Sequence, residues 1–448
     1  MAAGCECTLS EEKGGGFDRL SYLRMVEPAR RPLGLLDLTC IGINAIVGSS
    51  VFLFPGRLVG FLGPASILSF GLTGVLLVSV ALCFAEASSR FDRPGGSYLY
   101  AREAFGDWTG FGIGWVCWVT QIFGWAAVAN GIAVYLGYWD PGLARPVVVR
   151  AVAAAVIVVM GSLNYRGVKL GAWASNVFTA AKLLPLLAFV AMGLPAITFA
   201  RFHPFAPHGW APMGKACFLT YFAFQGFESV PVPAGEVERP ERNVPLATVT
   251  ALLVASVLYM LIQFTAVGVS PALAASSRPL ADAASYIFGP AGASIMVVGA
   301  AVSMTGFSAG EALTSPRYLV ALAQDGHLPA PLARPHPRFG SPYVAVTVTT
   351  ALTLAAALTL DFNKLVDFSN VVVCAQYIAT CVAVPMLRGQ RAGWTLPGGW
   401  TIPAIGVAAT LWLGLQGEPQ QIAWSAAMLA AGFALRAAFV GRAEPAAA

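Results

Sequence analysis

Charged residues are scarce in this sequence. Asp, Glu, Lys and Arg together make up only 11% of its 448 residues, whereas 57% are hydrophobic, and the mean hydropathy is +0.69. Soluble domains carry about a quarter charged residues, so this composition excludes an ordinary soluble protein. It indicates an all-α membrane protein, because long apolar stretches cross a bilayer as helices.

Side chains for catalysis and metal binding are also few. The sequence has only four histidines, all predicted to lie in loops, and it has neither a complete phosphate-binding glycine loop nor a His-rich cluster. We therefore expect no enzyme activity, no cofactor and no metal site. The Lys and Arg residues are dispersed along the chain without a basic stripe, so we expect no nucleic-acid partner.

Apolar stretches recur about every 35 residues, and most are long enough to cross a hydrocarbon core of about 30 Å. We predict twelve transmembrane helices in one integrated membrane domain. They cover residues 35–58, 64–88, 110–137, 146–164, 171–193, 211–234, 246–269, 287–312, 342–360, 364–387, 400–417 and 421–440.

The basic residues predict the orientation of these helices. On this layout, 19 of the 27 Lys and Arg residues lie on the side of the N-terminus and 7 on the other side. By the positive-inside rule both termini are cytoplasmic, and the membrane is the cell membrane. We divide the chain into a cytoplasmic tail (1–34), a ten-span core (35–388), two additional C-terminal spans (389–440) and a second cytoplasmic tail (441–448).

Two of the predicted spans contain helix-breaking residues near the middle of the membrane. Span one has Gly48, Ser49 and Ser50, and span six has Gly226 followed by two prolines. Backbone groups freed by a break are tolerated in a membrane only where they are buried in protein or line a wet cavity. We therefore predict that the helices break near Gly48 and Gly226. The alternative is that the small residues of span one only allow close helix packing.

The breaks fall at corresponding positions of two successive five-span units, which is typical of inverted-repeat transporters. In such a fold, the free NH groups at one break bind a carboxylate and the free carbonyl groups at the other bind an ammonium. A substrate with both groups is an amino acid.

Five motifs of the sequence are informative together: Gly42–Phe52, Phe222–Pro245, Pro94–Tyr98, Ser315–Tyr318 and Asp325–Pro329. In these motifs the chain resembles the amino acid, polyamine and organocation transporter superfamily, a family of amino acid permeases. The resemblance implies a leucine-transporter-like 5+5 inverted repeat with helices one and six broken. Ser50 departs from the family, which usually has a glycine there.

The breaks and the resemblance together give the predicted substrate site. Among its members, three phenylalanines of span six are candidates for an aromatic lid. The predicted substrate-binding residues are Ile43, Val47, Gly48, Ser49, Ser50, Phe222, Phe224, Gln225, Gly226 and Phe227. Glu228 is the one acidic residue that we predict in this site, which favours neutral amino acids over basic ones.

Lys182 and Glu228 are charged residues predicted inside the membrane, where a charge is costly and indicates a function by default. In some proton-coupled permeases of the family, a lysine at the position of Lys182 occupies the place of a sodium ion, which implies a role in proton coupling. The alternative for Lys182 is a permanent cap on backbone carbonyl groups. For Glu228 we leave open a role in gating or proton transfer and a structural role at the break.

The sequence thus predicts a permease for amino acids, driven by proton-coupled uptake through alternating access. An amino acid or amine exchanger is the alternative within transport, and a nutrient sensor that does not transport is the alternative of another class. The expected partners are the amino acid, protons and the lipid bilayer. The sequence leaves open the oligomeric state and which amino acid is carried.

Overall fold

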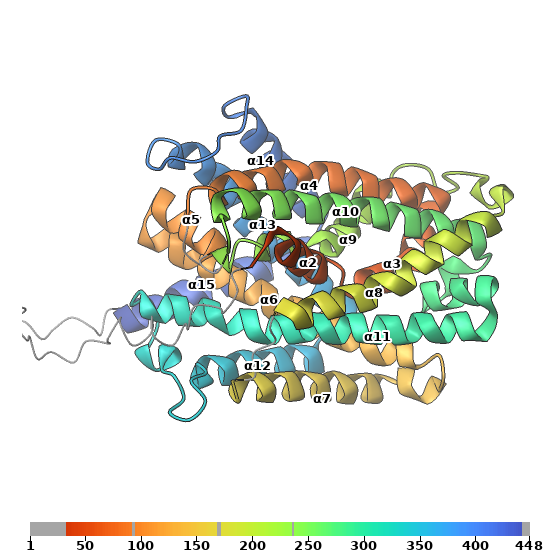
Figure 1. The fold of residues 1–448 in the computed structure, drawn as a ribbon, viewed down its shortest axis with the longest axis horizontal. Helices are drawn as coiled ribbons and strands as arrows, with labels where there is room; N and C mark the ends of the chain where they lie inside the picture. Colours follow the sequence, from red (N-terminus) through yellow and green to blue (C-terminus); the bar gives the residue numbers. More distant parts are fainter. Residues whose placement is uncertain (1–32, 92–94, 168–171, 235–236, 441–448) are drawn as a thin grey trace, which may run out of the picture. The chain divides into compact units, whose positions relative to one another are not determined.

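Helices form nearly all of the computed structural model, which describes residues 33–91, 95–167, 172–234 and 237–440 (Figure 1). Within these residues there is no β-strand, and one isolated bridge joins Leu33 to Val237. The helices are α2 (Leu35–Ile46), α3 (Ser50–Leu62), α4 (Ser66–Ser88), α5 (Gly96–Phe105), α6 (Asp107–Leu136), α7 (Pro146–Tyr165), α8 (Ala172–Gly193), α9 (Met213–Phe224), α10 (Pro240–Val269), α11 (Pro279–Gln324), α12 (Tyr343–Thr359), α13 (Phe362–Leu387), α14 (Thr401–Gly414) and α15 (Pro419–Val440).

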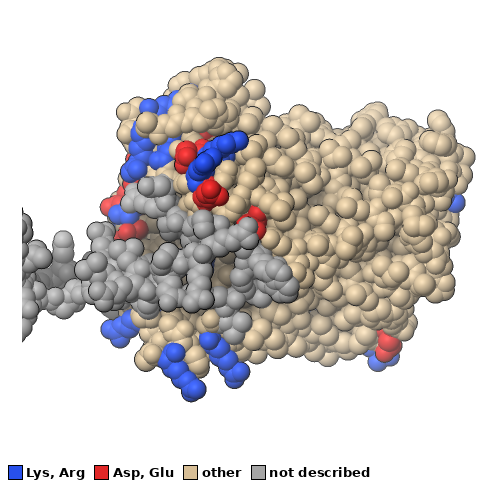
Figure 2. All heavy atoms as spheres, viewed as in Figure 1, with Lys and Arg blue, Asp and Glu red and all other residues tan. Residues whose placement is uncertain are grey.

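Every predicted span contains a helix in the structure. In the described ranges, eight helical stretches are long and apolar enough to cross a membrane by length and composition, and three apolar helices are shorter. These helices indicate a multi-pass membrane protein, while the count of twelve spans stays a prediction. Figure 2 agrees, because on the face shown Lys, Arg, Asp and Glu gather toward the ends of the helices and leave a broad band without charge.

Both predicted helix breaks are confirmed. In span one, α2 ends at Ile46, residues 47–49 are not helical, and α3 begins at Ser50. In span six, α9 ends at Phe224, and Gly226 has a φ of 128°, which only glycine adopts readily. The chain after Gly226 makes a single 3-10 turn, η5 (Phe227–Ser229), so the second half of this span is not a regular α-helix.

Span eight differs from its predicted bounds of 287–312. The helix α11 runs from Pro279 to Gln324, with a kink at Gly289, whose φ is 65°. The predicted span ends at residue 312, but the helix continues through Pro316 for about three further turns. The reason is that the polar side chains here are buried within the bundle and find partners on their own or neighbouring helices.

The helices pack in a regular pattern of neighbours. The helix of span two, α4, lies along that of span seven, α10; α6 of span three lies along α11 of span eight; and α7 of span four lies along α12 of span nine (Figure 1). The broken spans also meet, because α2 contacts η5 and α3 contacts α9. These contacts make four pairs of spans, and each pair joins a span to the one five spans later.

A buried ion-pair cluster joins α4 to α13 at one end of the bundle. The Glu86 carboxylate, fully buried, accepts from Arg90 Nη2 at 2.7 Å, Arg388 Nε at 2.7 Å and the Leu396 NH at 3.0 Å. Removing one member of a buried ion pair leaves an uncompensated charge, so this cluster stabilises the ends of both helices.

We predict that Glu86→Gln lowers the free energy of unfolding by about 3 to 5 kcal/mol, because two guanidinium groups lose their anionic partner. The matched control is Asp361→Asn in the exposed pair of Asp361 with Lys364, whose side chains are 57% and 65% exposed. It is expected to change that free energy by less than about 1 kcal/mol. Thermal unfolding of the purified variants in detergent measures both, and equal losses would contradict the assignment.

Candidate functional site

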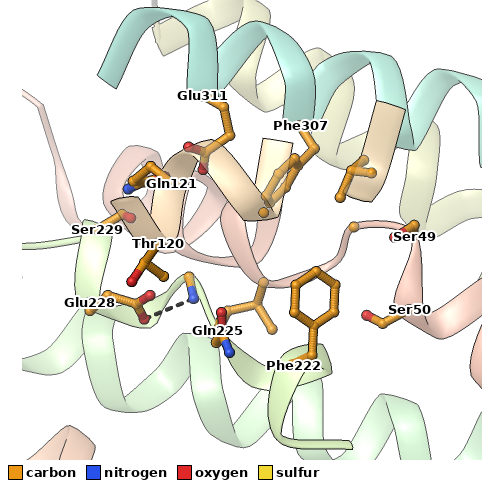
Figure 3. Close-up of a pocket in the computed structure, with 15 residues that line it drawn as sticks. Ser49, Ser50, Thr120, Gln121, Phe222, Gln225, Glu228, Ser229, Phe307 and Glu311 are labelled. Carbon is orange, nitrogen blue, oxygen red and sulfur yellow. Dashed lines mark hydrogen bonds between the residues drawn. The ribbon is translucent and has the colours of Figure 1, made fainter. Parts of the chain in front are cut away.

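A cavity lies where the two helix breaks meet, and α6 and α11 complete its wall (Figure 3). It lies inside the bundle, at the level where α2 and α9 end. Its lining residues are Ile46, Gly48, Ser49, Ser50, Thr120, Gln121, Gly124, Val128, Phe222, Gln225, Gly226, Glu228, Ser229, Phe307 and Glu311.

The first break places the N-terminus of α3 at the cavity. Ser49 and Ser50 line it, and the first NH groups of a helix have no partner within that helix and form its positive end. The Ser49 hydroxyl is buried and has no hydrogen-bond partner within the described part of the chain. This corner of the cavity is therefore suited to an anionic group.

The second break places the C-terminal end of α9 at the same cavity, through Phe222 and Gln225. The last carbonyl groups of a helix form its negative end. The Gln225 side chain is already engaged, because its amide donates to Asn370 Oδ1 at 2.7 Å and accepts from Ser369 Oγ at 2.8 Å. The backbone at this helix end is therefore the group available to a cation.

Gly226 brings the two breaks into direct contact. A Cβ atom at this position would lie 2.5 Å from the carbonyl carbon and oxygen of Ala45. The Tyr259 hydroxyl joins the breaks a second time, because it lies 3.0 Å from the carbonyl oxygen of Ile46 and 3.1 Å from that of Ala223.

Glu228 is bonded at the second break. Its Oε2 accepts from the Gly226 NH and from the Tyr377 hydroxyl, each at 2.8 Å. These bonds correspond to the structural role at the break, which was one of the two roles that the sequence left open for Glu228. A role in gating or proton transfer stays a prediction.

Lys182 lies behind the first break and does not line the cavity. Its ammonium donates to the carbonyl oxygens of Asn44 at 3.0 Å and Val47 at 2.7 Å, and its side chain is fully buried. The Ser303 hydroxyl of α11 donates to the same Val47 oxygen at 3.1 Å. The carbonyl groups freed where α2 ends are thus satisfied by side chains from α8 and α11.

Seven of the predicted site residues line the cavity: Gly48, Ser49, Ser50, Phe222, Gln225, Gly226 and Glu228. Ile43 and Val47 do not line it, and both are buried in the hydrophobic core.

Of the three candidates for an aromatic lid, only Phe222 lines the cavity. Phe224 packs against Phe70 and Tyr259, and Phe227 packs against Phe84. The sequence contains all three rings but does not show which of them faces inward.

Sequence reasoning missed the residues that α6 and α11 contribute, above all Glu311. This carboxylate accepts from Ser315 Oγ at 3.0 Å and faces the side-chain amide of Gln121. The signal was present, because an ionisable residue inside an apolar helix indicates function. Glu311 lies inside the predicted span, one residue before its end, but we did not single it out.

The sequence of α11 contains a motif that is typical of serine hydrolases, but this motif does not form a catalytic site. Residues 306–310 fit Gly-x-Ser-x-Gly, but they lie within a continuous helix, whereas the nucleophile of that motif stands on a strand-to-helix turn. The Ser308 hydroxyl is buried and donates to the Met304 carbonyl of its own helix.

A central cavity between two broken helices in a membrane-spanning bundle is typical of secondary transporters. A family model described as amino acid permease matches residues 33–433, so this chain belongs to the amino acid permease family. The predicted family membership is confirmed.

Three relatives from Bacillus subtilis (strain 168) illustrate the range of the family. The chain is 28% identical to the methylthioribose transporter over 416 residues, which cover 88% of this chain and 90% of that protein. It is 27% identical to the branched-chain amino acid permease BcaP, covering 86% and 87% of the two chains. It is also 27% identical to the serine/threonine exchanger SteT, covering 86% and 90%.

We predict that the glycines of the two breaks respond differently to alanine. Gly226→Ala should abolish substrate binding, because its methyl group would overlap the Ala45 carbonyl and push the breaks apart, at a cost of about 1 to 3 kcal/mol. Gly48→Ala is the matched control and should bind normally, because its Cβ would meet Phe307 and Val128 at ordinary distances of 3.5 and 3.6 Å.

Gly48→Leu should again abolish binding, because the larger side chain fills the cavity. Binding of a labelled substrate to purified protein measures all three variants, and gel filtration reports whether each is folded. Normal binding by Gly226→Ala would contradict the close contact between the breaks.

Proposed function

We propose that this chain is an amino acid permease that takes up its substrate by proton-coupled alternating access. The observation that carries the proposal is that the N-terminus of α3 and the C-terminal end of α9 face one cavity. They present opposite partial charges, which complement the carboxylate and the ammonium of a free amino acid. Two relatives carry the names of amino acid permeases or exchangers, which supports the same substrate class.

The pattern of helix neighbours supports a 5+5 inverted repeat as the basis of alternating access. When each of spans one to five is replaced by the span five positions later, and the reverse, nearly every pair of packed helices corresponds to another pair that also packs. For example, α2 packs on α10 as α4 packs on α9, and α8 packs on α11 as α13 packs on α6. A two-fold relation between the halves has this consequence.

In this proposal residues 35–388 form the ten-span transport core, residues 389–440 add two spans, and both termini are cytoplasmic. The positive-inside count supports that orientation.

The surroundings of Lys182 support coupling to protons. Its ammonium donates to two neutral carbonyl oxygens, those of Asn44 and Val47. The loss of a proton costs less free energy for a buried ammonium without an anionic partner than for an ammonium in a salt bridge. Its ammonium occupies a place on the carbonyl groups of the first break where a monovalent cation would otherwise bind. Transport should therefore not require sodium.

Uptake by purified protein in liposomes tests the function. A panel of radiolabelled amino acids is offered with and without an inward proton gradient, and with sodium replaced by potassium. We expect accumulation of at least one amino acid that depends on the proton gradient and not on sodium. A strict sodium requirement would contradict proton coupling, and uptake only against preloaded internal substrate would favour an exchanger.

We predict that Lys182→Arg abolishes proton-driven accumulation, because a guanidinium keeps its charge at any accessible pH. Lys182→Ala should remove the response to external pH while some substrate binding persists at the breaks. Lys364→Arg is the matched control, because Lys364 is exposed, and it should behave as the parent protein. Unchanged accumulation by Lys182→Arg would show that Lys182 does not carry the coupled proton.

A further inference from the structure

The cavity has an acidic side without a basic partner. Glu228 and Glu311 are among its lining residues, and no Lys, Arg or His is among the described residues that line it. Lys182 does not balance this charge, because its ammonium points at the carbonyl oxygens behind the first break.

Glu311 is the less constrained of the two carboxylates. It is 8% exposed, and its partners are the Ser315 hydroxyl and the Gln121 amide, both neutral. Glu86, which is also buried, instead has two arginines. A buried carboxylate is costly unless it is paired or stays protonated, so one that faces a cavity without a cationic partner is suited to a cationic ligand.

Thr120 supplies an independent indication of a ligand at the same place. Its side chain lines the cavity and is only 6% exposed, yet its hydroxyl has no hydrogen-bond partner among the described residues. Buried polar groups are nearly always bonded, so a free hydroxyl next to Gln121 points to a group that binds there. In Figure 3, Thr120 lies with Gln121 and Glu228 on one side of the cavity.

The acidic side lies opposite the N-terminus of α3. Figure 3 shows Ser49 and Ser50 at one end of the cavity and Glu228 and Glu311 at the other. The rings of Phe222 and Phe307 lie between these ends. A substrate held by its carboxylate at Ser49 and Ser50 would extend its side chain past the two rings toward the carboxylates.

We propose that Glu311 makes this protein selective for amino acids whose side chain ends in an ammonium or a similar cationic group, with Thr120 as a hydrogen-bond partner. This inference rests on the proposed function and assigns its substrate class. It reverses the sequence-based expectation of neutral substrates, which counted Glu228 alone. Glu228 adds negative charge to this side but is already bonded to Gly226 and Tyr377.

Binding of L-lysine and L-norleucine to the purified protein in liposomes tests the proposal, because norleucine has the unbranched side chain without the ammonium. A hydrogen bond to a charged group is worth about 1.5 to 3 kcal/mol, so the parent protein should bind lysine at least about tenfold more tightly. In Glu311→Gln, lysine and norleucine should bind within about threefold of each other, with norleucine unchanged from the parent.

Two further variants keep the test decisive. Glu311→Asp retains the charge and should keep the preference for lysine, even if Glu311→Gln fails to fold in gel filtration. Asp140→Asn is the matched control: it removes one exposed carboxylate, the asparagine can still accept from the Gly142 NH, and the preference should not change.

Three results would overturn the proposal. The first is a parent protein that binds norleucine as tightly as lysine. The second is a lysine preference that survives in Glu311→Gln. The third is a Glu311→Gln variant that loses the response of uptake to external pH while its substrate range stays the same, because Glu311 would then carry a proton. If the parent binds neither lysine, norleucine nor any other amino acid of the panel, the proposed function itself fails.

Discussion

The structure depends on partners for the backbone groups that the two helix breaks release inside an apolar bundle. An unsatisfied NH or carbonyl group costs several kcal/mol in hydrocarbon, so a break persists only where other groups bond to it. Lys182 and Ser303 bond to the carbonyl groups where α2 ends, Tyr259 reaches both breaks, and Glu228 accepts from the Gly226 NH. These contacts come from four different elements of the chain and therefore hold the bundle together around the breaks.

The same contacts determine which backbone groups remain for a ligand. Because side chains occupy the carbonyl groups at the end of α2, the first break presents mainly the NH groups of α3 to the cavity. At the second break, Glu228 takes the NH of Gly226 and Tyr259 reaches the Ala223 carbonyl, which leaves the carbonyl groups after Ala223 at the end of α9. The cavity is thus polarised before any substrate enters, and the carboxylate of Glu311 extends this polarity to its far side.

The breaks and Lys182 could be predicted from sequence because glycine, proline and charged residues are conspicuous in apolar helices. Their effect on the helix depends mainly on neighbouring residues in the sequence. That Glu311 faces the cavity could not be predicted, because this depends on how α11 is rotated within the bundle. The choice of Phe222 over Phe224 depends on how α9 is rotated in the bundle, which only its packing determines. The sequence also does not show that Gly226 and Ala45 touch, since this contact joins distant segments.

In the proposed function, the substrate binds between the two breaks, with its carboxylate on the N-terminus of α3. An experimental structure of the protein with bound amino acid, determined by electron cryo-microscopy, tests it most directly. We expect density in the cavity with the carboxylate within hydrogen-bond distance of the Ser49 and Ser50 NH groups, and with the side chain directed toward Glu311. A substrate bound outside this cavity, or one with its carboxylate next to Glu311, would contradict this binding mode.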